Sequence, residues 1–426
     1  MSTTGMRSVQ ASNGFYWQGR YEEALRFCER AIRLLPKTAR LYAQWGAILK
    51  GLGESKRALA AYERAIALDP GELLAWLGKG TVLYDLTNYE AALAAYEQVI
   101  ALDPDDPVAW YSKGNALDKL NRLEEALAAY EQASLLHPID AQILLRMADV
   151  LVALGRYEDA LAALEQSIDL APANVLAQMQ KAALLTRLDH PMEALALYTW
   201  VIQQEPECSA AHLGRGDVLL SLGRAEEALA AYQQAMRLDA TDARIYFRWG
   251  KALVLLGRYE QALRAFQRGL RLEPDYAPAY DGKGQALCGL KRYTEALRAY
   301  QEGIALGGDY LAVMYTNLGA ALWALGMLED ALASYHQAIT LDPMYAPAYT
   351  ARGDAFRELR WYREALAAYE RALDLNPCDS RACAGKRLAL EALERSRALF
   401  PSPERASAPG ASDDSGSEMA EAAPAG

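Results

Sequence analysis

The residue types that most often bind metals or act in catalysis, histidine and cysteine, are dispersed along this chain. Its four histidines fall at unrelated places: His137, His190, His212 and His336. Only His212 has a His or Cys three to five residues away, namely Cys208, and a lone pair does not complete a common zinc site. Two cysteines, Cys378 and Cys383, are five residues apart but lack the second pair that would complete a common zinc site. We therefore predict no metal site and no cofactor.

One short segment has residue types that could bind phosphate. In Gly78-Lys79-Gly80-Thr81 a lysine lies between two glycines, as in a phosphate-binding loop. Such a loop follows a strand and a glycine-rich turn, whereas the residues just before Gly78 already have helical spacing. The segment also recurs at the same phase as Ser112-Lys113-Gly114 and Gly282-Lys283-Gly284. We interpret it as helix-packing sequence and predict that the protein is not an enzyme.

Composition excludes several classes of partner. The 426 residues include 44 Lys and Arg against 55 Asp and Glu, and the net charge of −11 repels the phosphates of a nucleic acid. No stretch offers eighteen consecutive apolar residues, so we predict no membrane partner. The five cysteines are odd in number and mostly far apart, which favours reduced thiols and a cytoplasmic location.

Prolines mark a period of 34 residues. Six of them follow one another at that interval: Pro36, Pro70, Pro104, Pro138, Pro172 and Pro206. Ala240 and Gly308 take two later places of the series. Pro343 and Pro377 come one residue late, so we expect one inserted residue near 309–311. A fixed period of this length indicates stacked repeats instead of separate globular domains.

Each period contains two amphipathic stretches with helical spacing, as residues 39–72 show. Gly53, between the two, suits the left-handed residue that ends a helix. A glycine also recurs inside the first helix, as at Gly46, although it costs about 1 kcal/mol relative to Ala. Because the second helix has Ala at the matching place, as at Ala58, we expect the two backbones to approach where Gly faces Ala.

An aromatic residue, a Gly, an Ala, a second aromatic residue, another Ala and a Pro recur at set places from Gly5 to Asp379. This pattern resembles the tetratricopeptide repeat. The resemblance implies an all-α fold, namely a right-handed superhelical α-solenoid of eleven 34-residue helix-turn-helix repeats plus a C-terminal capping helix.

The phase of the repeats divides the sequence into five parts. Residues 1–38 form a degenerate first repeat, residues 39–310 repeats two to nine, and residues 311–379 repeats ten and eleven after a one-residue phase slip. Residues 380–400, with five basic and two acidic residues, are predicted to be a capping helix. Residues 401–426 are rich in Pro, Ser, Ala and Gly and are predicted to be a disordered tail. Glycines in place of the proline at the slip predict a hinge.

In the resembling family the first helices line a concave groove that receives a segment of a partner. Two positions of each first helix share one face: the residue directly after the recurring aromatic residue, and the residue four places further on. The residue directly after the aromatic is apolar in six consecutive repeats, and we expect these six residues to form a solvent-facing apolar stripe that marks an interaction site. Its members are Leu77, Tyr111, Leu145, Met179, Leu213 and Phe247. Polar neighbours complete the predicted partner-binding groove: Asn115, Arg146, Asp149, Arg248 and Lys251. The alternative is that some of these side chains pack against neighbouring helices.

Two better-defined functions of the resembling family fit the residues poorly. A clamp for a C-terminal carboxylate needs Lys before Asn115 and an Asn on the next first helix, but Tyr111 and Arg146 occupy those places. Sugar transferases that begin with such repeats present a row of asparagines, of which only Asn317 is found here.

We therefore predict a non-catalytic protein-protein interaction scaffold or adaptor that docks a protein or peptide segment in the groove. The alternatives are an RNA-binding helical-repeat protein, a regulatory or targeting subunit of an enzyme complex, and an enzyme without a recognisable motif. Against RNA binding, the related RNA-reading arrays have a period one residue longer and a basic groove. The partner's identity, its extended or helical form and the oligomeric state stay open.

Overall fold

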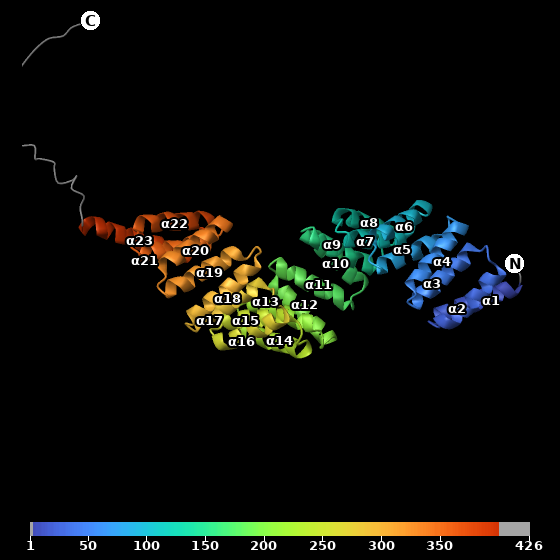
Figure 1. Ribbon diagram of the computed structural model, residues 1–426, viewed down its shortest axis with the longest axis horizontal. Coiled ribbons are helices and arrows are strands. Elements are labelled where there is room, and N and C mark those ends of the chain that lie inside the picture. The colour runs from blue at the N-terminus through green and yellow to red at the C-terminus, as the bar shows by residue number, and fades with distance from the viewer. Residues whose placement is uncertain (1–2, 400–426) are drawn as a thin grey trace, which may run out of the picture. The chain divides into compact units, whose positions relative to one another are not determined.

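A computed structural model describes the backbone of residues 3–399 and the side chains of residues 7–395. Within that range the chain forms twenty-three α-helices and no strand. Antiparallel pairs of consecutive helices make eleven hairpins, and one further helix follows them (Figure 1). We call the first helix of each hairpin its A helix and the second its B helix. The predicted all-α repeat fold is confirmed.

The chain divides into two compact units, and the first comprises Met1–Leu238 with seven hairpins. Its A helices are α1 (Thr3–Trp17), α3 (Ala39–Gly51), α5 (Leu73–Asp85), α7 (Pro107–Lys119), α9 (Ala141–Ala153), α11 (Val175–Arg187) and α13 (Ser209–Ser221). Its B helices are α2 (Tyr21–Leu34), α4 (Ser55–Leu68), α6 (Tyr89–Leu102), α8 (Leu123–Leu136), α10 (Tyr157–Leu170), α12 (Pro191–Gln204) and α14 (Ala225–Leu238).

The second unit, Asp239–Gly426, has four hairpins and a last helix. Its A helices are α15 (Ala243–Leu255), α17 (Ala277–Gly289), α19 (Leu311–Ala324) and α21 (Ala346–Glu358). Its B helices are α16 (Tyr259–Leu272), α18 (Tyr293–Leu306), α20 (Leu328–Leu341) and α22 (Tyr362–Leu375), and α23 (Ser380–Leu399) completes it. The tail predicted at residues 401–426 lies outside the described residues.

Three residues link the A helix to the B helix in every hairpin, and the middle one has a positive φ. Six of these residues are glycines: Gly19, Gly53, Gly155, Gly223, Gly257 and Gly326. Five carry a side chain: Thr87, Asn121, Asp189, Lys291 and Arg360. The left-handed turn predicted at Gly53 is therefore the rule, and five repeats adopt it without glycine.

Eight of the eleven A helices contain a glycine that accommodates an aromatic ring of the B helix of the same hairpin. A Cβ added at Gly46 would lie 2.7 Å from the ring of Tyr62 on the B helix, and one added at Gly78 of the next A helix would lie 2.3 Å from the same ring. The Tyr62 ring is thus wedged between two A helices. The long Tyr62 side chain of the B helix thus reaches across the hairpin to Gly46, a contact that the expected approach of Gly46 and Ala58 did not include.

Proline and the A-helix aromatic are joined by a hydrogen bond. The indole Nε1 of Trp76 donates to the carbonyl oxygen of Pro70 at 2.9 Å, and Trp110 bonds to Pro104 in the same way at 2.8 Å. In the second unit the hydroxyl of Tyr280 replaces the indole. This bond closes the link between consecutive repeats.

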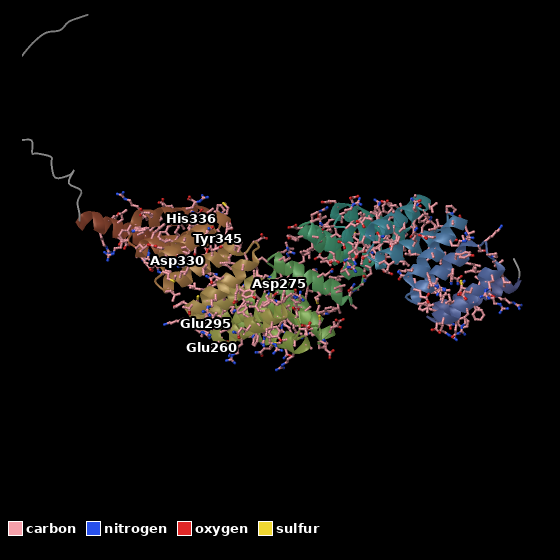
Figure 2. All side chains as sticks on the ribbon, viewed as in Figure 1. Glu260, Asp275, Glu295, Asp330, His336 and Tyr345 are labelled. Atoms are coloured by element: carbon pink, nitrogen blue, oxygen red, sulfur yellow. The ribbon has the colours of Figure 1, made fainter. Side chains whose placement is uncertain are left out.

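The B helices other than α4 begin with exposed acidic residues. Figure 2 labels three in the second unit, Glu260, Glu295 and Asp330, each in the first turn of its helix. Negative charge there complements the helix dipole. Arg292, just before α18, adds an ion pair to Glu295 at 2.7 Å.

The phase slip changes a helix and leaves the length of the preceding link unaltered. Four residues separate α18 from α19, as in the other links from a B to an A helix, but α19 has 14 residues where the other A helices after α1 have 13. Gly307 and Gly308 have φ values of 76° and 94°. Tyr310 then has ψ of 2°, whereas Tyr276 and Tyr345, at the same place before α17 and α21, have ψ of 90° and 86°. The extra residue is therefore absorbed at the start of α19.

Candidate functional site

A groove of about 740 Å³ lies on the first unit, lined mainly by the A helices α1, α3 and α5. Its walls are largely apolar, with Leu41 and Ala43 buried and Leu74 half-exposed at the edge. Trp17, at the end of α1, is 83% exposed and lines the same groove. Exposed aromatic and aliphatic surface gathered in one concavity marks an interaction site.

The Tyr62 ring also reaches the groove between α3 and α5. It does so because Gly46 and Gly78 leave room for it on both sides. Burial raises the pKa of the Tyr62 hydroxyl above its ordinary value, so this group stays neutral at physiological pH. The floor therefore offers an apolar ring edge without charge.

The charged residues that line this groove are two cations, Arg40 and Lys50, and none is acidic. Lys50 pairs with Asp85 at 3.1 Å, while Arg40 is exposed. A smaller hollow of about 380 Å³ shares Arg40, Leu74 and Leu77 with the groove, and its lining also includes the acidic residues Asp69, Glu72 and Asp106. An occupant of the groove alone thus meets positive charge, and one that extends into the smaller hollow also meets negative charge.

The predicted apolar stripe is only partly exposed. Leu77 lines the groove, and Tyr111, Met179 and Leu213 are half-buried in the first unit. Leu145 is 1% exposed, so the expectation of a solvent-facing residue is wrong there. Its side chain belongs to the hydrophobic core of the hairpins around α9.

Phe247, in the second unit, is 7% exposed and also departs from the expectation. Its ring stacks on Tyr276 with centroids 4.7 Å apart. A Cβ at Gly269 would lie 2.3 Å from this ring, so the Phe247 side chain fills a space that the glycine leaves on α16. Arg248 and Lys251, on the same helix, are exposed.

Two predicted polar site residues hold neighbouring elements together. Asn115 accepts a hydrogen bond at 2.7 Å from the hydroxyl of Tyr130 on its own B helix. Asp149 accepts one at 2.6 Å from the amide of Gln180 on the next A helix and pairs with Arg146 at 3.3 Å. Burial raises the pKa of Asp149, and the Arg146 guanidinium opposes that shift. These bonds give Asn115 and Asp149 a structural role.

Three exposed apolar residues were missed by the sequence pattern. Leu74, Val108 and Leu176 are 51%, 53% and 49% exposed in the first turns of α5, α7 and α11. They precede the stripe members Leu77, Tyr111 and Met179 by three residues. The helical i, i+3 relation was the available signal, because residues at that spacing share a face.

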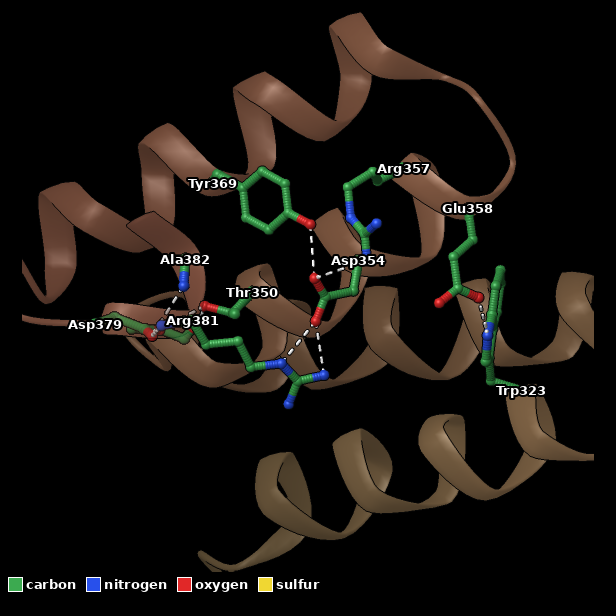
Figure 3. A network of polar contacts seen from close by, with 10 residues as sticks. Trp323, Thr350, Asp354, Arg357, Glu358, Tyr369, Asp379, Arg381 and Ala382 are labelled. Carbon is green, nitrogen blue, oxygen red and sulfur yellow. Dashed lines mark hydrogen bonds and ion pairs between the residues drawn. The ribbon is translucent and has the colours of Figure 1, made fainter. Parts of the chain in front are cut away.

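The second unit has a hollow of about 410 Å³ between α19, α21 and α23. Asp354 there accepts hydrogen bonds from the Tyr369 hydroxyl at 2.6 Å and from Arg381 of α23 at 2.7 Å (Figure 3). Trp323 donates to Glu358 at 2.6 Å at the other side of the hollow. These charged groups are mutually paired, so the network fastens α23 onto α21 and leaves little for a ligand.

Metal-binding clusters of three or more His, Cys, Asp or Glu residues do not occur in the part of the chain that the structure describes. None of the helices within residues 3–399 combines the length and apolar character needed to cross a membrane. Burial raises the pKa of Cys28 to about 12, which disfavours the reactive thiolate.

Comparison with known families matches most of the chain to models of the tetratricopeptide repeat. One model matches residues 44–107, 80–142, 111–175, 145–189 and 180–243. Others match residues 12–35, 219–288, 312–345 and 346–377. No curated protein matches the chain in sequence.

Among solved structures, a tetratricopeptide repeat protein from Parabacteroides merdae is similar with 18% identity and a TM-score of 0.51, covering 59% of this chain and 98% of that one. Yeast Tom70 is similar with 14% identity and a TM-score of 0.48, covering 93% and 97%. MamA from Desulfovibrio magneticus has 26% identity and a TM-score of 0.38, covering 41% and 98%. The first of these likenesses supports the fold.

Proposed function

This chain belongs to the tetratricopeptide repeat family, and from that membership we propose that it is a non-catalytic scaffold that docks a partner protein in the groove over α1, α3 and α5. Repeats of this family generally mediate protein-protein interaction. The single observation that supports the site is the apolar groove of about 740 Å³ with exposed Trp17 and Leu74 at its edges.

The lining indicates what the partner segment offers. Trp17, Leu74 and Leu77 would each contact an apolar side chain, and burial of such a side chain contributes about 1.5–3 kcal/mol. An acidic group over Arg40 would add a weaker, salt-sensitive attraction, because the Arg40 guanidinium is exposed to water. We therefore propose a segment that combines bulky apolar residues with at least one carboxylate.

Substitution at the groove edge tests this proposal. We expect Leu74→Asp combined with Leu77→Asp to remove the partners that co-purify with the full chain, because two carboxylates would enter an apolar contact. Leu102→Asp is the matched control, since Leu102 is 47% exposed on a B helix outside the groove. Leu145 and Phe247 are unsuitable positions because both are buried.

The measurement is quantitative mass spectrometry of proteins captured by the wild-type chain and the two variants, with helical content checked by circular dichroism. Partners lost by the groove variant but kept by Leu102→Asp support the proposal. Equal capture by all three folded proteins would contradict it. Partners released by ribonuclease treatment would favour the RNA-binding alternative, and a groove-independent enzyme in the captured set would favour the regulatory-subunit alternative.

A further inference from the structure

Asp281 is a carboxylate buried on the A helix α17, with 1% of its surface exposed. Three side chains donate hydrogen bonds to it: Gln285 at 2.7 Å, Asn317 at 2.7 Å and the Tyr310 hydroxyl at 3.2 Å. No cation within the described part of the chain forms an ion pair with it. Its negative charge is therefore solvated by neutral donors alone.

These donors connect two A helices across the phase slip. Gln285 lies one turn along α17, Asn317 lies on α19, and Tyr310 is the residue immediately before α19. The two left-handed glycines, Gly307 and Gly308, come just before Tyr310. The Asp281 bonds to Tyr310 and Asn317 thus hold the segment that contains the irregular link and the extra residue of α19.

Among the residues whose side chains are described, no positively charged group acts on Asp281. The titratable groups that interact with it from the adjacent elements are Cys288 of α17, Tyr300 of α18, and Tyr310 and Tyr345, which precede α19 and α21. Burial raises the pKa values of Cys288, Tyr300, Tyr310 and Tyr345, so these four stay neutral at pH 7. A buried carboxylate without a counter-ion is costly even when it is hydrogen-bonded.

We propose that the link between α18 and α19 is a hinge and that Asp281 is its latch. The three hydrogen bonds hold the closed form, while the uncompensated negative charge favours an open form in which water solvates the carboxylate. The two glycines with positive φ provide the backbone freedom for opening. Ionisation of Asp281 therefore sets the balance between the closed and open hinge.

The direction of the pH dependence follows from burial. Desolvation raises the pKa of Asp281 in the closed form above its ordinary value of 3.8. In the open, solvated form the pKa returns toward that value. The stabilisation of the closed form by the protonated group is complete below pH 3.8 and is lost as the pH rises through the closed-form pKa. Between low pH and a pH above both pKa values, the equilibrium constant for opening increases about tenfold for each unit by which the closed-form pKa exceeds the open-form pKa.

Amide hydrogen exchange of residues 306–313 in the full chain, measured from pH 4 to 8 and corrected for intrinsic exchange, tests the latch. We expect wild-type protection of this link to fall as the pH rises and then to level off. Asp281→Asn and Asp281→Thr should show no such fall, since neither side chain ionises. Threonine is a suitable replacement because Thr316 and Thr350 occupy this position in the next two repeats.

Asp354→Asn is the control, because Asp354 is a carboxylate of the same unit that already has a cation in Arg381. It should keep the wild-type pH profile at residues 306–313. A wild-type profile that matches that of Asp281→Thr would overturn the latch. Strong protection of the link at every pH in all four proteins would overturn the hinge as well.

Discussion

At the scale of single residues, the repeat depends on contacts between a small residue and a large one. In eight A helices a glycine is matched to a ring of its own B helix, as Gly80 is to Tyr96, where an added Cβ would lie 2.5 Å from the ring. The glycines lower intrinsic helix propensity by about 1 kcal/mol each relative to Ala. Burial of a tyrosine ring in the space they leave offsets that loss.

Gly80→Ala should therefore destabilise the protein despite the better helix propensity of alanine. Forcing a methyl group against a packed ring costs about 1–3 kcal/mol, which exceeds the propensity gain of about 1 kcal/mol in most of that range. Gly14→Ala in α1 is the control, because nothing lies within 4 Å of a Cβ there. Chemical denaturation should show opposite signs for the two variants, and equal stabilisation by both would contradict the ring-wedge explanation.

The period and the residue types predicted which positions have small residues. They did not predict which side chain fills the space beside each of them. The phase places Gly46 and Ala58 at matching points of their helices, yet the Tyr62 ring occupies the room beside Gly46. The reach of a long side chain depends on its rotamer and on the crossing of the helices, which a one-dimensional pattern does not contain. The same reason explains Leu145, which occupies the same position in its repeat as the groove-lining Leu77 but lies in the core.

At the scale of elements, the turn between the A and B helices is the most regular part of the chain. Its middle residue is left-handed in all eleven hairpins, although a side chain in that conformation costs roughly 1–2 kcal/mol. The glycine phase in the sequence predicted this turn. It did not predict Thr87 or Arg360 in it, because neither residue type signals a positive φ.

Thr87→Gly should stabilise the first unit. The φ of Thr87 is 61°, and glycine removes the steric cost of a β-branched side chain there, while its greater freedom in the unfolded chain costs about 0.5–1 kcal/mol. The net gain is expected to be about 0.5–1 kcal/mol in urea unfolding. The reverse change, Gly155→Thr at φ 75°, should lose stability, and a gain there would show that the turn tolerates side chains freely.

At the scale of the whole molecule, each unit is a stack in which repeats contact mainly their sequence neighbours. Ion pairs along the stack show the same locality: Lys79 reaches Glu63 of the preceding repeat, and Lys113 reaches Glu97. In such arrays stability is close to a sum of repeat and interface contributions. The number of repeats was predictable from the period, whereas the division after Leu238 was not, because the period continues unchanged across it.

Locality also predicts which fragments keep the proposed partner site. A fragment of residues 1–238 contains α1, α3 and α5 and should retain the captured partners of the full chain. A fragment of residues 73–426 lacks α1 to α4 and should lose them. Co-purification from matched amounts of folded fragment measures this, and partners retained by residues 73–426 would place the docking surface elsewhere.

The constant link lengths have a consequence for how this chain accepts added residues. Because three residues always lead from an A to a B helix and four from a B to an A helix, one extra residue had to enter a helix, and it entered α19. One residue turns an α-helix by about 100°. Removing a residue from the first turn of α19 would therefore restore the 34-residue period. It would also rotate Tyr310 relative to the rest of α19 and move the Tyr310 hydroxyl away from Asp281. The register of the array and the Tyr310–Asp281 bond of the proposed hinge thus depend on the same single residue.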